Sequence, residues 1–184
     1  MTLDALRDHL LTHAVRRGEF TLKSGRRSTW FIDGKQTLCR PEGLLLVAEA
    51  ALAVLPAEAT AIGGLTMGAD PMAFGLAGVA ATTGRMLRSC SIRKDPKDHG
   101  VTGRLAGALE AGDRVVVVED VVSRGTSVLE AARVVRELGA EPVLLLAVVD
   151  RGGTCGELAA AEGIPFHPLL TAPDLGLPYE GGAG

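Results

Sequence analysis

Residues 115–127 decide the fold of this chain and read Val-Val-Val-Val-Glu-Asp-Val-Val-Ser-Arg-Gly-Thr-Ser. Four consecutive β-branched residues are typical of a short strand that is buried on both faces of a sheet. After Gly125 the apolar residues have helical spacing, at Val128, Leu129, Ala132, Val135 and Leu138. The stretch therefore predicts a strand, an acidic pair, a small polar loop and a helix. Because ligands of open α/β sheets bind beyond the carboxyl ends of the strands, we expect a binding site here.

The loop after this strand combines groups that bind a phosphate. Gly125 lets the backbone approach a ligand closely, and the predicted start of a helix there points unpaired N–H groups at the loop. Three hydroxyl side chains add donors, those of Ser123, Thr126 and Ser127. The carboxylates of Glu119 and Asp120 would repel a phosphate but accept hydrogen bonds from sugar hydroxyls. A solvated acidic turn with ordinary helix caps is the alternative, but the combination favours a site for a phosphorylated ribose.

This stretch resembles the phosphoribosyl pyrophosphate (PRPP) signature of type I phosphoribosyltransferases. The signature has four apolar residues, two acids, two further residues, then Thr or Ser, a small residue, Gly and Thr. The chain departs from it at Arg124, where a small residue is commoner. The resemblance implies that PRPP is bound by the whole run, namely Glu119, Asp120, Val121, Val122, Ser123, Arg124, Gly125, Thr126 and Ser127.

Composition indicates a globular protein and argues against several functions. The 184 residues, 47% of them hydrophobic, are enough for one domain with its own core. A net charge of −3 and 3% aromatic residues argue against nucleic-acid binding. The widely spaced Cys39, Cys90 and Cys155 indicate reduced thiols, and so a cytoplasmic protein. Asp4 and Asp8 argue against a secretory signal, and no apolar run reaches the roughly 18 residues of a membrane span.

A second informative stretch, Ile92-Arg-Lys-Asp-Pro-Lys-Asp-His-Gly100, carries the basic side chains of Arg93, Lys94, Lys97 and His99. Residues 93–110 are polar, rich in glycine and without periodicity, which predicts a long mobile loop. Such a loop could close over a polyanion and stabilise charge on a leaving group, although a solvated charged loop is the alternative. The order Arg-Lys-x-x-Lys-x-His-Gly resembles the catalytic loop of orotate phosphoribosyltransferases. That resemblance implies catalytic and PRPP-binding roles for the four basic residues, and a catalytic role for Asp120.

The N-terminal third predicts a helix over residues 2–17, ended by Gly18, and then two short strands at 20–25 and 28–33. The strands could form a small hood over the site, mainly from residues 18–40. A solvated edge hairpin is the alternative.

The hood sequence carries a further resemblance. Phe-Thr-Leu-Lys-Ser-Gly-Arg, followed by Trp-Phe-Ile-Asp, is similar to the N-terminal segment of orotate phosphoribosyltransferases. The resemblance implies that Lys23 contacts PRPP and orotate, and that Phe31 and Ile32 lie near the base. Ile32 stands where a second Phe is commoner, so stacking would depend on Phe31 alone.

Strands and helices alternate over most of residues 41–170, which predicts an α/β fold with a largely parallel sheet flanked by helices. The expected strands include 61–64, 86–92, 142–150 and an edge strand at 166–170, and the expected helices include 41–55 and 153–162. A glycine-rich turn at 63–68 could cradle an anion. Some phosphoribosyltransferases carry a lysine in the corresponding loop, where this chain has Met67 and Gly68. The tail from Glu180 to Gly184 is typical of disorder.

Arg151 follows the strand at 142–150 and is therefore expected at the same crevice. Arginine binds carboxylates through two parallel hydrogen bonds. The resemblance assigns Arg151 to the carboxylate of orotate, with Ser123 also contacting orotate. A surface arginine that caps a turn is the alternative.

Together the motifs imply an orotate phosphoribosyltransferase, which makes orotidine 5′-monophosphate and pyrophosphate from orotate and PRPP in pyrimidine synthesis. The resemblance also implies Mg²⁺, held mainly by PRPP near Glu119 and Asp120, and a homodimer in which residues 93–110 reach the neighbouring site. Another phosphoribosyltransferase, such as a purine-salvage enzyme, and a regulatory PRPP-binding protein are the alternatives. The basic loop favours the orotate enzyme, and the sequence has no basic face or added nucleic-acid-binding domain of the kind regulators tend to carry.

Overall fold

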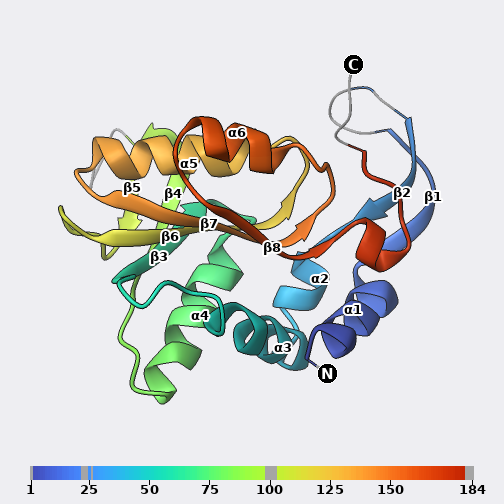
Figure 1. The fold of residues 1–184 in the computed structure, drawn as a ribbon, viewed down its shortest axis with the longest axis horizontal. Coiled ribbons are helices and arrows are strands. Elements are labelled where there is room, and N and C mark those ends of the chain that lie inside the picture. Colours follow the sequence, from blue (N-terminus) through green and yellow to red (C-terminus); the bar gives the residue numbers. More distant parts are fainter. Residues whose placement is uncertain (1, 22–24, 26, 98–102, 181–184) are drawn as a thin grey trace.

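A six-stranded sheet in the order β5-β4-β3-β6-β7-β8 forms the centre of the computed structural model (Figure 1), which describes residues 2–21, 25, 27–97 and 103–180. Its strands are β3 (Ala61–Leu65), β4 (Arg88–Lys97), β5 (Gly103–Gly107), β6 (Arg114–Val122), β7 (Glu141–Asp150) and β8 (Phe166–Thr171). Neighbouring strands are parallel except for β4 and β5. The predicted α/β fold with a largely parallel sheet is confirmed.

Helices cover both faces of this sheet (Figure 1). One face carries α1 (Thr2–His13), α3 (Pro41–Leu52) and α4 (Asp70–Thr82), and the other carries α5 (Thr126–Glu137) and α6 (Cys155–Ala161). The valine run explains why both faces are covered. Val116 and Val118 belong to the first core and Val115 and Val117 to the second, because successive side chains of a strand alternate between its faces.

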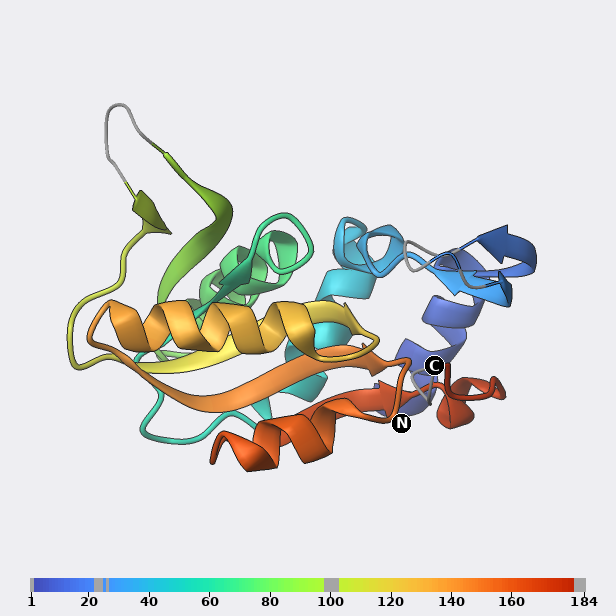
Figure 2. The same cartoon turned by 90° about the horizontal axis from the view of Figure 1, so that it is seen from above.

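A separate two-stranded antiparallel sheet forms the hood beside the main sheet (Figure 2). It pairs β1 (Val15–Thr21) with β2 (Arg27–Ile32), and Val15 lies opposite Ile32. The predicted helix over residues 2–17 is therefore wrong at its end, since α1 ends at His13. Pairing with β2 outweighs the helical spacing of this segment, because helix propensity is a weak preference that tertiary contacts override.

Residues 93–110 are more regular than the sequence predicts. β4 continues to Lys97 and pairs with β5, and the resulting hairpin projects from the sheet (Figure 2). Arg93 Nη1 donates to the carbonyls of Gly103 (3.2 Å) and Leu105 (2.8 Å). The prediction of an irregular loop is therefore wrong for the residues in these strands, which satisfy each other's backbone groups. Residues 98–102 lie outside the described residues, and the mobility of the segment remains a prediction.

Two short elements complete the chain, α2 (Lys35–Leu38) and a 3₁₀ turn, η1 (Pro173–Leu175). The sequence did not predict α2, because four residues are too few to show a period. Within the described residues, no helix is long and apolar enough to cross a lipid bilayer.

Candidate active site

The crevice expected from the sequence opens at the carboxyl ends of β3, β6 and β7. β3 and β6 are neighbours although β4 and β5 lie between them in sequence, and the helices that follow them, α4 and α5, lie on opposite faces. Such a topological switch leaves a crevice between the two connections. A cavity of about 510 Å³ opens there, termed the loop cleft, and is lined by Thr21, Phe31, Glu119, Val121, Val122, Ser123, Arg124, Gly125, Thr126, Ser127, Val128, Arg151 and Glu180.

The loop from β6 to α5 requires glycine at one position for two reasons. Gly125 has φ of 83°, in the left-handed region that side chains disfavour. A Cβ atom at this position would also lie 2.9 Å from Cys155 Sγ. The first turn of α5 begins at Thr126, so its unpaired N–H groups and the loop hydroxyls are available to an anion. The N–H groups and hydroxyls that the sequence predicted to bind phosphate thus lie together on this loop.

Glu119 and Asp120 lie within the last part of β6 and are buried, at 9% and 5% exposure. Burial, together with the adjacent charge of Asp120, raises the pKa of Glu119. Glu119 Oε2 is buried and, within the described part of the chain, has no hydrogen-bond partner. An unpaired acceptor of this kind is costly in a free protein and suits a ligand that donates hydrogen bonds.

The loop between β3 and α4 contacts this acidic pair through its backbone. A Cβ atom at Gly68 would lie 2.4 Å from Glu119 Oε1 and 2.7 Å from Asp120 Oδ1. Only glycine permits such a close approach. A second cavity of about 310 Å³ lies here, termed the acidic cleft, and is lined by Lys35, Leu65, Thr66, Met67, Gly68, Lys94, Glu119, Asp120 and Ser127.

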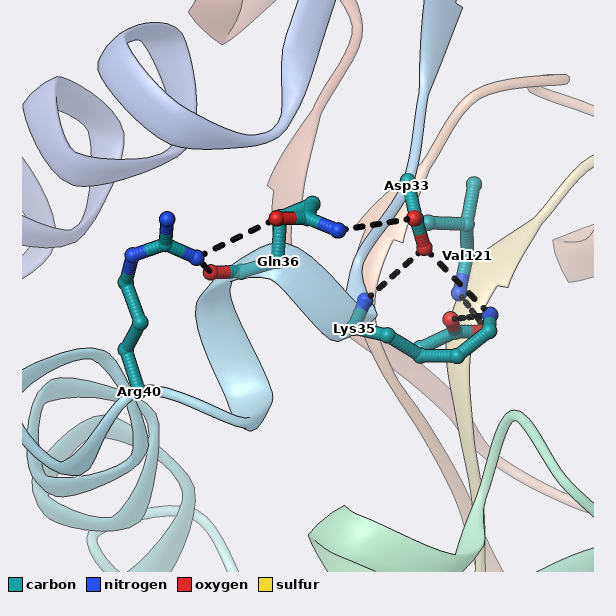
Figure 3. A network of polar contacts seen from close by, with 6 residues as sticks. Asp33, Lys35, Gln36, Arg40 and Val121 are labelled. Carbon is teal, nitrogen blue, oxygen red and sulfur yellow. Dashed lines mark hydrogen bonds and ion pairs between the residues drawn. The ribbon is translucent and has the colours of Figure 1, made fainter.

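Lys35 is a site residue that the sequence analysis missed. Its Nζ donates to Asp120 Oδ2 at 2.8 Å and lies 3.5 Å from Asp33 Oδ1. Figure 3 shows it within a polar network that continues on one side through Asp33 and Gln36 to Arg40. The only sequence signal is an isolated lysine two residues after a predicted strand, and its partner lies 85 positions away.

Arg151 lies at the carboxyl end of β7, where Asp150 holds the turn that follows. Asp150 Oδ1 accepts the backbone N–H groups of Gly152 (3.0 Å) and Gly153 (2.9 Å). The guanidinium carbon of Arg151 lies 4.6 Å from the centre of the Trp30 ring, a cation–π contact. Arg151 Nη2 donates to Ser28 Oγ (3.2 Å) and to the Trp30 carbonyl (3.1 Å). The side chain is only 6% exposed, so it is not a surface arginine.

Glu180 completes the environment of Arg151. Its carboxylate accepts a hydrogen bond from Arg151 Nη2, and its backbone N–H donates to the Arg151 carbonyl at 3.0 Å. The prediction of disorder is therefore wrong for Glu180, because a buried guanidinium holds it; residues 181–184 lie outside the described residues. Arg151 Nε is buried and, among the described residues, has no hydrogen-bond partner. Arg151 as a residue lines the loop cleft, together with Glu180.

Phe31 and Ile32 lie on opposite sides of β2. Phe31 is 38% exposed and lines the loop cleft. Ile32 is 4% exposed and belongs to the hydrophobic core with α1 and α3. This alternation follows from the two-residue period of a strand. The structure therefore brings Phe31 to the site and does not bring Ile32 there.

The basic residues of the stretch 92–100 lie in different environments. Lys94 lines the acidic cleft, whereas the guanidinium of Arg93 binds the carbonyls of its own hairpin. Lys97 ends β4 with its backbone opposite Gly103. Lys23 and His99 lie outside the described residues, so their roles remain predictions.

Comparisons with known proteins agree with this geometry. The family model for the phosphoribosyl transferase domain matches residues 55–159. The chain is 41% identical over 172 residues to an orotate phosphoribosyltransferase of Rhodopseudomonas palustris (strain TIE-1), covering 91% of this chain and 92% of that protein. It is 39% identical over 157 residues to that of Aquifex aeolicus (strain VF5), covering 85% and 86%.

Solved structures show the same likeness. The crystal structure of Mycobacterium tuberculosis H37Rv orotate phosphoribosyltransferase with Fe(III) dicitrate has a TM-score of 0.83 and 31% identity, covering 96% of this chain and 100% of that chain. The structure of that enzyme with PRPP has a TM-score of 0.79 and 29% identity, with the same coverage. From its sequence, its fold and the geometry of its clefts, the chain belongs to the orotate phosphoribosyltransferases of the phosphoribosyltransferase family.

Proposed function

We propose that the chain acts as its family does, transferring the phosphoribosyl group of PRPP to orotate, and that its two clefts divide the substrates. The loop cleft binds the 5′-phosphate and the orotate base, and the acidic cleft binds the pyrophosphate. The observation that carries this division is the buried acidic pair between the clefts, with an unpaired oxygen on Glu119. We also propose that residues 1–184 form one domain, with the hood drawn from its N-terminal part.

The phosphate and the ribose are held from the β6–α5 segment. The N–H groups of α5 and the hydroxyls of Ser123, Thr126 and Ser127 bind the 5′-phosphate. The carboxylates of Glu119 and Asp120 accept hydrogen bonds from the two ribose hydroxyls. This arrangement directs C1 of the ribose, which carries the pyrophosphate, toward the acidic cleft.

Orotate enters between the hood and β7. Arg151 donates from its guanidinium to the orotate carboxylate, and the exposed ring of Phe31 packs against the base. A ring nitrogen of orotate then bonds to C1 as the bond to pyrophosphate breaks, and the proton of that nitrogen leaves to the departing pyrophosphate or to water. Lys94 in the acidic cleft stabilises the departing negative charge, so positioning and electrostatics supply much of the rate. Lys97 and His99 are proposed to add to this charge from the adjacent hairpin.

The site fits Mg²⁺ that arrives with the substrate. Glu119 and Asp120 offer carboxylate oxygens, while the part of the chain that the structure describes has no cluster of three or more His, Cys, Asp or Glu side chains able to hold a metal alone. Mg²⁺ keeps few protein ligands and pairs with phosphate oxygens. When bound, it would neutralise pyrophosphate charge beside the acidic pair.

The activity is tested by the loss of orotate absorbance when PRPP and Mg²⁺ are added to the purified chain. Uracil, hypoxanthine and adenine serve as competing bases, and we expect turnover of orotate alone. Turnover of another base in place of orotate would identify a different phosphoribosyltransferase. Binding of PRPP without any turnover would identify a regulatory protein.

We further propose a cytoplasmic homodimer in which the β4–β5 hairpin reaches the neighbouring site, supported by its projection from the sheet (Figure 2). Inactive Lys97→Ala and Asp120→Asn dimers should then complement each other after subunit exchange. Half of a random mixture is heterodimer with one intact site of two, so activity should recover to about a quarter of wild type. Verified heterodimers without activity would contradict a hairpin that acts across the interface between independent sites.

A further inference from the structure

Lys35 lies beside the acidic pair, and no sequence motif assigns it a role. Its side chain is 41% exposed, whereas that of its partner Asp120 is 8% exposed. The ammonium group therefore covers a buried carboxylate from the solvent side. Because water reaches the ammonium group, Lys35 can leave this pair provided that another donor takes its place on the buried Asp120.

The acidic cleft adjoins the loop cleft, since Glu119 and Ser127 line both. With the 5′-phosphate on the loop and the ribose hydroxyls on the acidic pair, the pyrophosphate faces Lys35 and Lys94. The β3–α4 loop at this cleft reads Thr-Met-Gly-Ala at residues 66–69 and has no cation of its own. A lysine from α2 thus supplies positive charge that this loop lacks.

Lys35 and the ribose hydroxyls compete for Asp120. Asp120 Oδ1 accepts a hydrogen bond from the backbone N–H of Val121 at 2.9 Å, and Oδ2 accepts one from Lys35 Nζ at 2.8 Å (Figure 3). A hydroxyl that donates to Oδ2 takes the place of the ammonium group. The four-carbon stem of lysine is flexible, so the displaced group can turn into the adjoining cleft.

We propose that Lys35 is an exchangeable counterion, which neutralises Asp120 in the free enzyme and binds the pyrophosphate of PRPP once the ribose hydroxyls occupy Asp120. This inference rests on the proposed function, which places pyrophosphate in the acidic cleft. The exchange leaves neither the ammonium nor the carboxylate without a partner. It also places a cation where negative charge grows as the bond to C1 breaks.

Calorimetry tests this proposal, because the affinities for inorganic pyrophosphate and for ribose 5-phosphate report separately on the two halves of PRPP. Lys35→Met keeps an unbranched side chain and removes the charge. We expect its affinity for PRPP with Mg²⁺ to fall about 10- to 150-fold, the range for losing a hydrogen bond between charged groups. Its affinity for inorganic pyrophosphate should fall less, because without ribose hydroxyls Lys35 stays on Asp120 in the wild type. Ribose 5-phosphate should bind as tightly as to wild type or more tightly, because Asp120 is no longer engaged. Lys35→Arg should restore much of the PRPP affinity.

The matched control is Arg40→Met, which removes a positive charge from the same polar network but does not line either cleft. Its affinities for all three ligands should be unchanged. Unaltered PRPP affinity in Lys35→Met would overturn the proposal. Equal losses for PRPP and ribose 5-phosphate would also overturn it, because Lys35 would then only orient Asp120. Failure of the wild-type chain to turn over orotate with PRPP would instead contradict the proposed function.

Discussion

Two pairs of opposite charge flank the proposed ribose site, and they differ in how far water reaches them. In the Lys35–Asp120 pair the cation is 41% exposed, whereas in the Arg151–Glu180 pair the cation is 6% exposed and the acid 13%. An exposed lysine can change partners at little cost, because water compensates for a lost contact. A buried guanidinium cannot, because it would leave a charge without a partner.

The difference matches what each end of the site must do. The carboxylate of orotate keeps its charge during the reaction, so a fixed arginine between Trp30 and Glu180 suits it. The pyrophosphate gains charge and then leaves, so a cation that can move suits it better. Burial thus decides whether the same kind of ion pair is a fixed or an exchangeable part of the site.

The largest effect is expected for Arg151→Ala. Removing one partner of a buried pair costs about 3–5 kcal/mol of the free energy of unfolding. The orotate KM should also rise about 10- to 150-fold while PRPP affinity stays near normal, because a charged hydrogen bond is lost. Thermal unfolding and steady-state kinetics measure the two effects, with Arg133→Ala as the control, because Arg133 is exposed and lines neither cleft. An unchanged orotate KM would remove Arg151 from the proposed base site.

Asp120→Asn should weaken PRPP binding by about 100-fold, because an amide cannot replace the charge that favours the ribose hydroxyls and Mg²⁺ together. Thermal stability should change less than in Arg151→Ala, since the lost ion pair is partly exposed. Asp33→Asn is the control, as Asp33 also contacts Lys35 but lines neither cleft. Equal PRPP affinity of Asp120→Asn and wild type in calorimetry would contradict the ribose assignment.

Glu180→Gln should lower the free energy of unfolding by about 1–3 kcal/mol, because Arg151 loses the countercharge of a hydrogen-bonded carboxylate. The orotate KM should rise less than in Arg151→Ala, since Ser28 and Trp30 still hold the guanidinium. Glu162→Gln is the control, because Glu162 pairs with the exposed Arg133 and Arg136. Equal destabilisation by the two variants would contradict the difference in burial on which the comparison rests.

The smallest effect concerns pH. Burial and the charge of Asp120 raise the pKa of Glu119, so part of the free enzyme carries a proton there near neutral pH. Ribose hydroxyls and Mg²⁺ favour the ionised form. PRPP binding should therefore release protons and strengthen as pH rises toward the raised pKa, by at most about tenfold per pH unit. Calorimetry in buffers of different ionisation enthalpy measures the release, and Glu119→Gln should reduce it. Identical enthalpies in all buffers would contradict this titration.

The local patterns of the sequence predicted the parts of the fold that are periodic. The valine run and the spacing after Gly125 predicted β6 and α5, since alternation and helical period record which face is buried. The position of Arg151 directly after a predicted strand placed it at the crevice, whereas Phe31 was assigned to the site only by the resemblance of the hood sequence. The local patterns failed at the end of α1, where pairing of Val15 with β2 outweighs local spacing, and at residues 93–97, where a hairpin orders the backbone.

By itself, the sequence determined the α/β alternation, the phosphate loop and the acidic pair, because each lies within one continuous stretch. Only the tertiary structure decided that Lys35 covers Asp120, that Glu180 holds Arg151 and that Ile32 faces the core. The two ion pairs join residues 85 and 29 positions apart, and no local period records such a contact. Their function depends on how deeply each pair is buried, which is a property of the packed chain.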